Sequence, residues 1–272
     1  MYGIVQKQRL ASNIILMDIK APAVAAKCRP GQFVIIRTHE KGERFPITVA
    51  DVDQMKGLVS IIFAEVGKSS IQLGKLGIGD AILNFSGPLG NATKINRYGD
   101  ILCVAGGVMV GAMLYQMRAL KDAGNNITTI VGARNKDHLI LVNDVKKISN
   151  ELIIATDDGS EGFTGLDFLN DLVKEKRFSH VFTIGPTSMQ RTVSEVTKPY
   201  NIPTTVNLFP IMVDGTGMCG ACRVSIGEET KFACVHGPDF DGHLVNYDEL
   251  ISRMRFYNPN EKIAMVLFDG GF

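Results

Sequence analysis

The pattern of apolar and polar residues divides the chain into three parts, and the first covers residues 1–96. Its apolar runs are short, rich in Ile, Val and Phe, and bounded by Gly, Pro and Asp, as in NIILMDIKAP, QFVIIRT, GLVSIIFAEV and DAILNFSGP. Runs of this length and spacing predict an antiparallel β-barrel or sandwich. Only SSIQLGKLGI interrupts them, with a short helical pattern.

From residue 97 to about residue 206, strand and helix patterns alternate. DILCVAGG is a continuous apolar strand that runs into glycines, and VGAMLYQMRALKDAG follows with helical periodicity up to Gly124. NITTIVGAR, ELIIATDDGS and HVFTIGP predict further strands, whereas GLDFLNDLVKE and TSMQRTVSEVTKPY predict helices. This alternation predicts a parallel α/β sheet.

Residues 207–272 form a third region, which is rich in Gly and Cys at its start. Near its end, YDELISRMRFY predicts a short helix and the apolar run KIAMVLF predicts a terminal strand. The expected fold is therefore β plus α/β, with an antiparallel barrel, a parallel α/β domain and a small C-terminal region.

Composition narrows the class of protein only slightly. Of the 272 residues, 45% are hydrophobic and 21% are charged, and 29 basic against 28 acidic residues leave a net charge of +1. This balance is typical of a globular protein and does not suggest nucleic acid as a partner. No run of 18 apolar residues predicts a membrane span, and the N-terminus resembles a strand rather than a signal peptide. We therefore expect a cytoplasmic protein.

The five cysteines carry the strongest chemical signal. An odd number in a chain of this size argues against a disulfide framework. Cys103, inside ILCVAGG, is expected to be a buried small hydrophobe. Cys219, Cys222 and Cys234 have the spacing C-x2-C-x11-C, which supplies three of the four ligands of a tetrahedral metal site. The nearest candidates for the fourth ligand are Asp214, His236 and Asp239.

Spacing favours an iron–sulfur cluster over zinc. Zinc ribbons usually pair two C-x-x-C knuckles, and this chain has only one. With Asp214 included, the pattern D-x4-C-x2-C-x11-C has the form of plant-type ferredoxins, with Asp in the first place. We therefore predict a 2Fe–2S cluster, with zinc as the alternative.

Two glycine-containing stretches could bind phosphate groups. VAGGVMVGAMLYQMRAL predicts a strand, a turn and a helix, in which Gly106, Gly107 and Gly111 would let a nucleotide approach the backbone. Its GG-x3-G spacing is also compatible with a plain tight turn. EVGKSSIQLGKL places Gly67 directly before the start of a helix. This pattern predicts an anion-binding helix N-terminus or, alternatively, a helix that is simply capped by a serine.

Two polar stretches could complete the binding sites. In ERFPITVAD, Arg44 could bind a phosphate and Thr48 could hydrogen-bond a ring nitrogen, although an edge strand carrying a proline has the same pattern. TDDGSEGFTG is an acidic, Gly-rich loop at the end of a strand, where open α/β sheets bind ligands. Its alternative interpretation is a surface loop.

These segments together resemble a known family. RFPITVAD, GPLG, TDDGS, IGP, PIMVDGTGMCGACRV and FACVHGPDFDGHLV are similar to the ferredoxin–NADP reductase superfamily and, within it, to the electron-transfer subunit of dihydroorotate dehydrogenase. The similarity is greater still to the small subunit of NADH-dependent ferredoxin:NADP oxidoreductase and to sulfide dehydrogenase-type chains, because Asp214 stands where the dihydroorotate dehydrogenase subunit has Cys. The resemblance covers nearly the whole chain.

The resemblance implies FAD in a barrel domain at 1–96, NAD(H) in an α/β domain at 97–206, and a 2Fe–2S cluster in the region 207–272. It also implies a larger partner subunit carrying flavin and iron–sulfur centres, with ferredoxin reached through the complex. By position it assigns Arg44, Pro46, Ile47 and Thr48 to FAD, with Thr48 as the catalytic residue; Gly67, Lys68, Ser69 and Ser70 to its pyrophosphate; Gly106, Gly107, Val108, Arg134, Asp157 and Asp158 to the nicotinamide nucleotide; and Asp214, Cys219, Cys222 and Cys234 to the cluster.

Two residues depart from the relatives and support a second function. The relatives' nucleotide turn reads G-G-x-G-x-x-P, whereas this chain has Met109 in place of the third glycine and Ala112 in place of the proline. If these residues narrow the site, the chain would be an electron relay with FAD and cluster but without NAD(H). NADPH in place of NADH is left open by Arg134 and Lys136. A zinc-stabilised structural protein is the third hypothesis.

Overall fold

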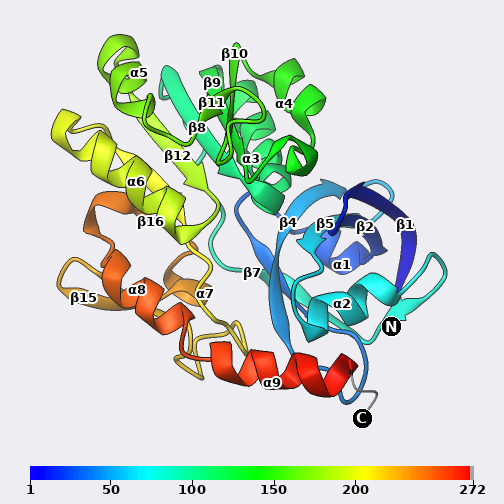
Figure 1. The fold of residues 1–272 in the computed structure, drawn as a ribbon. Helices are drawn as coiled ribbons and strands as arrows, with labels where there is room; N and C mark the ends of the chain where they lie inside the picture. The colour runs from blue at the N-terminus through cyan, green and yellow to red at the C-terminus, as the bar shows by residue number, and fades with distance from the viewer. Residues whose placement is uncertain (270–272) are drawn as a thin grey trace.

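The computed structural model describes residues 1–269, and its N-terminal part is an antiparallel barrel (Figure 1). Within these residues, seven strands pair in the order β6-β1-β2-β5-β4-β3-β7, and neighbours are antiparallel throughout. The strands are β1 (Tyr2–Ala11), β2 (Ile14–Lys20), β3 (Phe33–Arg37), β4 (Phe45–Asp53), β5 (Leu58–Ala64), β6 (Ala81–Ile82) and β7 (Asn84–Leu89). Two helices, α1 (Pro22–Ala25) and α2 (Lys68–Lys75), complete this part, and α2 confirms the predicted helical pattern.

The second part is the predicted parallel α/β sheet. Its strand order within the described residues is β11-β10-β9-β8-β12-β13-β16, and only β16 runs antiparallel to its neighbour. The strands are β8 (Asp100–Gly106), β9 (Asn126–Ala133), β10 (Glu151–Thr156), β11 (Phe163–Thr164), β12 (His180–Ile184), β13 (Thr204–Asn207) and β16 (Asp239–Asp241). Because β16 comes from the region after residue 206, the C-terminal region is joined to this sheet by strand pairing.

Helices cover both faces of the parallel sheet. One face packs against α3 (Val110–Asp122) and α4 (Val142–Ile148), and the other packs against α5 (Leu169–Lys176) and α6 (Thr187–Thr197). Short 3₁₀ turns follow three of the elements: η1 (Gly107–Met109), η2 (Lys136–His138) and η3 (Lys198–Tyr200). The buried runs of β8 and β12 are continuous because both of their faces are covered.

Helix α3 also packs against the barrel. Strand β2 turns Ile15, Met17 and Ile19 into the barrel core, whereas Ile14 and Leu16 pack with residues of α3. This alternation follows from the two-residue period of a strand. A Cβ at Gly111 would lie 2.5 Å from the Ile62 Cδ1 atom, so glycine allows α3 to approach β5 closely. Gly111 therefore serves packing between the two parts, and the prediction that it admits a nucleotide was wrong.

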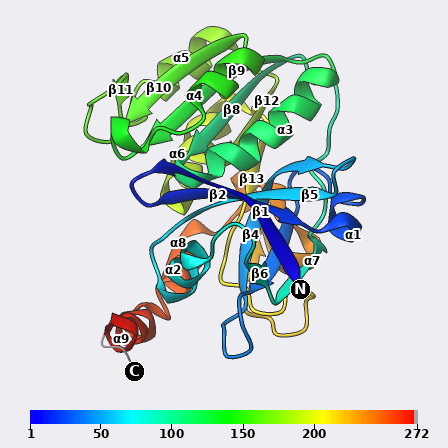
Figure 2. The same cartoon turned by 90° about the vertical axis from the view of Figure 1, so that its right-hand side faces the viewer.

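The C-terminal region contains a hairpin and several short helices. Its elements are β14 (Arg223–Ile226), β15 (Glu229–Phe232), α7 (Ala233–His236), η4 (Gly242–Leu244), α8 (Tyr247–Met254) and α9 (Asn258–Asp269). The predicted terminal strand KIAMVLF was wrong, because these residues lie in α9. A short apolar run does not distinguish strand from helix, and the preceding Pro259 and Glu261 are helix-start residues. Figure 2 shows α9 below α2, and the two helices are in contact.

A buried carboxylate joins the three regions. Asp239, at the start of β16, accepts hydrogen bonds from the Thr93 hydroxyl at 2.6 Å and from the Asn207 amide. Thr93 lies between β7 and β8, and Asn207 ends β13. Burial raises the pKa of Asp239 to about 6, although the two hydrogen bonds lower it. Among the described residues, no helix is long and apolar enough to cross a membrane.

Candidate cofactor sites

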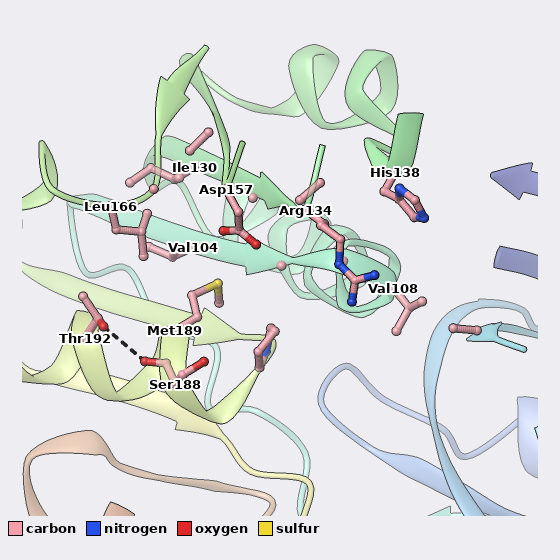
Figure 3. Close-up of a pocket in the computed structure, with 18 of the residues that line it drawn as sticks. Val104, Val108, Ile130, Arg134, His138, Asp157, Leu166, Ser188, Met189 and Thr192 are labelled. Atoms are coloured by element: carbon pink, nitrogen blue, oxygen red, sulfur yellow. Dashed lines mark hydrogen bonds between the residues drawn. The ribbon is translucent and has the colours of Figure 1, made fainter. Parts of the chain in front are cut away.

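A cleft of about 560 Å³ opens at the carboxyl ends of the parallel strands (Figure 3). It lies beyond β8, β9, β10 and β12, where open α/β sheets bind ligands. Barrel residues Asn13, Ile14, Ala64 and Val66 line its other side. Figure 3 shows Arg134 and Asp157 directed into the same space, opposite Met189 and Ser188 of α6. A ligand in this cleft would contact both the barrel and the α/β sheet.

The glycine turn forms one wall of the cleft. Gly106, Gly107 and Val108 line it, as predicted for a nucleotide-binding turn. Gly107 has a φ of +57°, and a Cβ there would meet nothing within 4 Å, so this backbone is open to a ligand. Met109 and Ala112 are absent from the lining; Ala112 is buried in the core and Met109 packs against it. Neither departure from the relatives' turn narrows the cleft.

The predicted polar residues of this site divide into two groups. Arg134 and Asp157 line the cleft, whereas Asp158 does not. Asp158 is exposed, and hydrogen bonds from Ser160 lower its pKa. Sequence reasoning missed His138, Asp167, Ser188 and Thr192, which also line the cleft. The signal for Ser188 and Thr192 was the strand end IGP followed directly by a helix start.

On the barrel, Thr48 has an unusual environment. The residue is 5% exposed, and its Oγ1 atom has no hydrogen-bond partner within the described part of the chain. Residues 45–48 of β4 pair with β3, whereas the pairing of β4 with β5 starts only at Val49. The backbone edge beside Pro46, Ile47 and Thr48 is therefore open, while Arg44 is exposed just before the strand. A buried hydroxyl without a partner is costly unless a ligand satisfies it.

The start of α2 forms a second polar position on the barrel. The Ser70 hydroxyl accepts from the Gly67 amide at 3.0 Å and donates to the Gly67 carbonyl at 2.9 Å, so it caps the helix. The Ser69 hydroxyl donates to Glu43 at 2.6 Å. Space remains beside Gly67, where a Cβ would meet nothing within 4 Å. An anion beside Gly67, Lys68, Ser69 and Ser70 would meet first-turn backbone N–H groups, which have no partners within a helix.

Asp214 organises the loop that contains the first two clustered cysteines. Its carboxylate accepts hydrogen bonds from the amides of Thr216 at 3.0 Å, Met218 at 3.1 Å and Cys219 at 2.9 Å. These bonds lower the pKa of Asp214 and keep it ionised. The loop turns sharply because glycines in it adopt positive φ angles; these are Gly215, Gly217 and Gly220.

The hairpin β14–β15 brings two cysteines together. Cys222 precedes β14 and Cys234 follows β15, and their Sγ atoms lie 3.2 Å apart in a buried position. Burial, contact with Cys222 and the charge of Asp214 raise the pKa of Cys234 to about 12, whereas the Gly217 amide lowers it. Cys219 is exposed. Among residues 1–269, no three metal-ligating side chains converge, so the structure brings together two of the four predicted ligands.

The donor set nevertheless fits an iron–sulfur cluster. Two adjacent thiols, a third thiol on the same glycine-rich loop and an ionised carboxylate are the ligand types that the spacing predicted. The other two candidates for the fourth ligand have structural contacts instead. His236 accepts from the Phe232 amide at 2.9 Å, and both carboxylate oxygens of Asp239 are hydrogen-bonded.

Comparison with known proteins identifies the family. Residues 210–246 match the iron-sulfur cluster binding domain of dihydroorotate dehydrogenase B. The chain is 46% identical to the dihydroorotate dehydrogenase B electron transfer subunit homolog of Thermotoga maritima, over 97% of this chain and 94% of that protein. The chain belongs to this family of electron-transfer subunits and their homologues.

Solved structures agree with membership of the electron-transfer subunit family. A chain of the NADH-dependent reduced ferredoxin-NADP oxidoreductase, a protein described for flavin-based electron bifurcation, is 44% identical and superposes with a TM-score of 0.93 over 98% of each chain. Phthalate dioxygenase reductase is 20% identical with a TM-score of 0.62, covering 83% of this chain and 85% of that one, and shares the fold. The barrel, the parallel α/β sheet and the C-terminal region of this chain therefore share the fold of the 44% identical chain over nearly its whole length.

Proposed function

We propose that this chain is an oxidoreductase subunit that passes electrons from NADH, through FAD and a 2Fe–2S cluster, to a larger partner subunit. The observation that carries the proposal is the cleft between the glycine turn of the α/β sheet and the barrel, in a chain whose residues 210–246 match an iron–sulfur domain. When bound, FAD takes a hydride and releases electrons singly, and the cluster accepts one electron at a time.

The barrel would hold FAD along the open edge of β4. Thr48 would donate its hydroxyl proton to a flavin ring nitrogen, which satisfies a buried oxygen that otherwise has no partner. Arg44 and the first-turn amides of Lys68 and Ser69 would bind the pyrophosphate, with Gly67, Pro46 and Ile47 leaving room for the cofactor. Thr48 is therefore the residue we assign to orienting the reactive ring.

The cleft would hold the nicotinamide nucleotide against the flavin. Gly106, Gly107 and Val108 would contact it through the backbone, and Arg134 and Asp157 would bind its polar groups. The barrel residues Ile14 and Val66 would help to exclude water at the closed side. Asp158 lies outside the cleft and has no proposed role in binding. Both NADH and NADPH suit a cleft that contains Arg134 and Asp157, and the NADH-dependent relative favours NADH.

The C-terminal loop would hold the cluster. Cys222 and Cys234 would bind as thiolates from the buried side, Cys219 from the exposed side, and Asp214 as the fourth ligand. Binding would remove the proton from the Cys234 thiol, whose pKa is raised chiefly by burial. The larger partner subunit, with ferredoxin reached through the complex, is proposed from the family of electron-transfer subunits and from the ferredoxin-dependent relative.

The test is an anaerobic visible spectrum of the purified chain during stepwise addition of NADH. Flavin and iron–sulfur absorption that NADH bleaches supports the proposal. If dithionite bleaches both absorptions and NADH has no effect, the alternative of an electron relay without a nicotinamide site replaces it. A colourless protein that contains zinc and no iron would leave only the structural hypothesis.

A further inference from the structure

A hollow of about 290 Å³ lies beside the cluster loop, and two arginines line it. Arg223 starts β14 directly after Cys222, and Arg253 comes from the last turn of α8. The predicted cluster ligand Cys219 lines the same hollow and is the exposed cysteine of the C-x2-C pair. Two cationic side chains and one predicted cluster ligand therefore share this hollow.

Arg253 is bound to the backbone of the cluster loop. Its Nη2 atom donates to the Ala221 carbonyl at 3.1 Å. This carbonyl belongs to the peptide bond between Ala221 and Cys222, so the guanidinium is held at the segment that joins Cys219 to Cys222. Arg253 is half-buried, whereas Arg223 is exposed. The charge of Arg253 therefore has a fixed position next to two predicted cluster ligands.

Helix α8, which carries Arg253, is anchored away from the cluster loop. It packs against α6 (Figure 1), where the Tyr247 and Ser194 hydroxyls are hydrogen-bonded at 2.8 Å. Leu250 is 2% exposed and belongs to a core cluster that also contains residues of β13 and β14. Arg253 therefore reaches the loop from a support that does not depend on the cluster ligands.

Neither arginine of the hollow is neutralised by a carboxylate. Among the side chains that the structure describes, no ion pair includes Arg223 or Arg253. Glu249, one turn before Arg253 in α8, accepts from the Ser225 hydroxyl instead. Partial burial of an unpaired guanidinium costs free energy, and an anion beside the loop would offset this cost.

An iron–sulfur cluster would supply the missing negative charge. An oxidised 2Fe–2S cluster with four anionic ligands is negatively charged, and reduction adds a further electron. Net charge and hydrogen bonding around the cluster are among the properties that set its reduction potential. A cation fixed beside the ligand loop therefore stabilises the reduced form more than the oxidised form.

We propose that Arg253, assisted by Arg223, raises the reduction potential of the cluster and is a positioning residue for electron transfer from FAD. This inference rests on the proposed function, because it requires the 2Fe–2S cluster. In the step concerned, FAD is oxidised by one electron, the cluster is reduced by the same electron, and no bond to the cluster forms or breaks. Arg223 contributes less because water and salt screen an exposed charge.

The experiment is a redox titration of the full chain, loaded with FAD and iron, in which the electron paramagnetic resonance of the reduced cluster is recorded at each potential. Arg253→Gln removes the charge but keeps a donor for the Ala221 carbonyl. We expect it to lower the ratio of reduced to oxidised cluster about tenfold at a given potential, a shift of about 59 mV to more negative values. Arg253→Lys should restore most of this ratio, and Arg223→Gln should lower it about threefold.

The matched control is Arg255→Gln, which removes the same charge two residues further along the chain. Arg255 is exposed and is not among the residues that line the hollow. This variant should change the ratio of reduced to oxidised cluster by less than about twofold. Added salt should diminish the effect of Arg223→Gln and preserve most of the effect of Arg253→Gln, because only the Arg253 guanidinium is half-buried.

Two results would overturn the inference. The first is an unchanged potential in Arg253→Gln with full iron content. The second is an equal shift in Arg253→Gln and Arg253→Lys, because the hydrogen-bond geometry and not the charge would then set the potential. If Arg253→Gln fails to bind iron, Arg223→Gln decides, since Arg253 and not Arg223 is bound to the Ala221 carbonyl; an unchanged potential in that variant overturns the inference. Absence of iron from the unmodified chain would instead refute the proposed function.

Discussion

The cleft and the cluster loop obtain their geometry in different ways. Around the cleft, parallel strands end side by side, so backbone pairing places Gly107, Arg134 and Asp157 before any ligand binds. In the cluster loop, three glycines with positive φ angles and one carboxylate hold a segment without strand pairing. There, only Cys222 and Cys234 meet, where the β14–β15 hairpin brings them together.

This difference shows which site is preformed. The carboxyl ends of the strands around the cleft are rigid because each of these strands is hydrogen-bonded to a neighbour on both sides. A loop of glycines loses much conformational entropy when it is ordered, so it gains most of its order from the group that it binds. We therefore expect nucleotide binding to depend on individual contacts, and the cluster loop to depend on the cluster as a whole.

The largest expected effect is the loss of the cluster in Cys222→Ser. Without this buried thiolate, we expect iron content below about a tenth of the unmodified value, because cluster ligands act together. Flavin absorption should remain, since Thr48 and α2 lie on the barrel. The control is Cys28→Ser, which changes a buried cysteine of the barrel core and should keep its iron. Retention of the cluster in Cys222→Ser would show that the loop has another ligand set.

The second prediction concerns Asp239, which joins β16 to Asn207 of β13 and to Thr93 between β7 and β8. Because the folded-state pKa, about 6, lies above the ordinary value of 3.8, the folded protein holds this proton more tightly than the unfolded chain. Below about pH 4, Asp239 therefore does not lower the free energy of unfolding. As the pH rises through about 6, it lowers that free energy by up to about 3 kcal/mol. Asp239→Asn should remove this loss of stability. Urea unfolding at several pH values should then show a difference in the free energy of unfolding between the variant and the unmodified protein that grows as the pH rises.

A second variant checks the Asp239 assignment. Thr93 donates to the Asp239 carboxylate and lowers its pKa, so Thr93→Val should raise the folded-state pKa further and make the loss of stability larger and continue to higher pH. A difference between Asp239→Asn and the unmodified protein that stays constant from pH 4 to pH 7 would contradict the assignment. The Asn207 amide can rotate to accept from the new Asn, since its Oδ1 atom has no partner among the described residues.

The third prediction tests the preformed cleft with matched glycines. Gly107 and Gly227 have φ angles of +57° and +59°, and a Cβ at either position meets nothing within 4 Å. Gly107→Ala and Gly227→Ala should therefore each lower the free energy of unfolding by about 1 kcal/mol. Only Gly107→Ala should also weaken NADH binding, by about tenfold, because its methyl group enters the cleft. Equal NADH affinity of the two variants, measured by titration of flavin absorption, would place the nucleotide elsewhere.

The smallest expected effect is that of Thr48→Val. Removing one hydrogen bond of about 1 kcal/mol should slow flavin reduction by NADH about fivefold in stopped-flow measurements. Thr183→Val is the matched control, since the Thr183 hydroxyl is also buried without a partner but lies on β12. Thr48→Ser should restore the rate. If the Thr183 variant slows reduction equally, the effect is one of packing and Thr48 has no special role.

Sequence periodicity predicted most of the fold for identifiable reasons. The runs that became β8, β9 and β12 are mostly apolar and almost continuously buried because these strands are covered on both faces, so the parallel sheet was predictable. The terminal run KIAMVLF was misassigned because a short apolar segment has no period of its own. The role of Gly111 was misassigned for another reason, since contact with Ile62 joins residues far apart in the chain.

By itself, the sequence determined the order of the barrel, the α/β sheet and the cysteine region, and the spacing of the predicted cluster ligands. These are local properties, since periodicity and spacing are set by neighbouring residues. Only the tertiary structure decided that Arg134 and Asp157 share a cleft with Ile14 of the barrel, that Asp158 lies outside it, and that α9 leaves an apolar side uncovered. Such relations depend on how distant segments pack, and no local pattern encodes them.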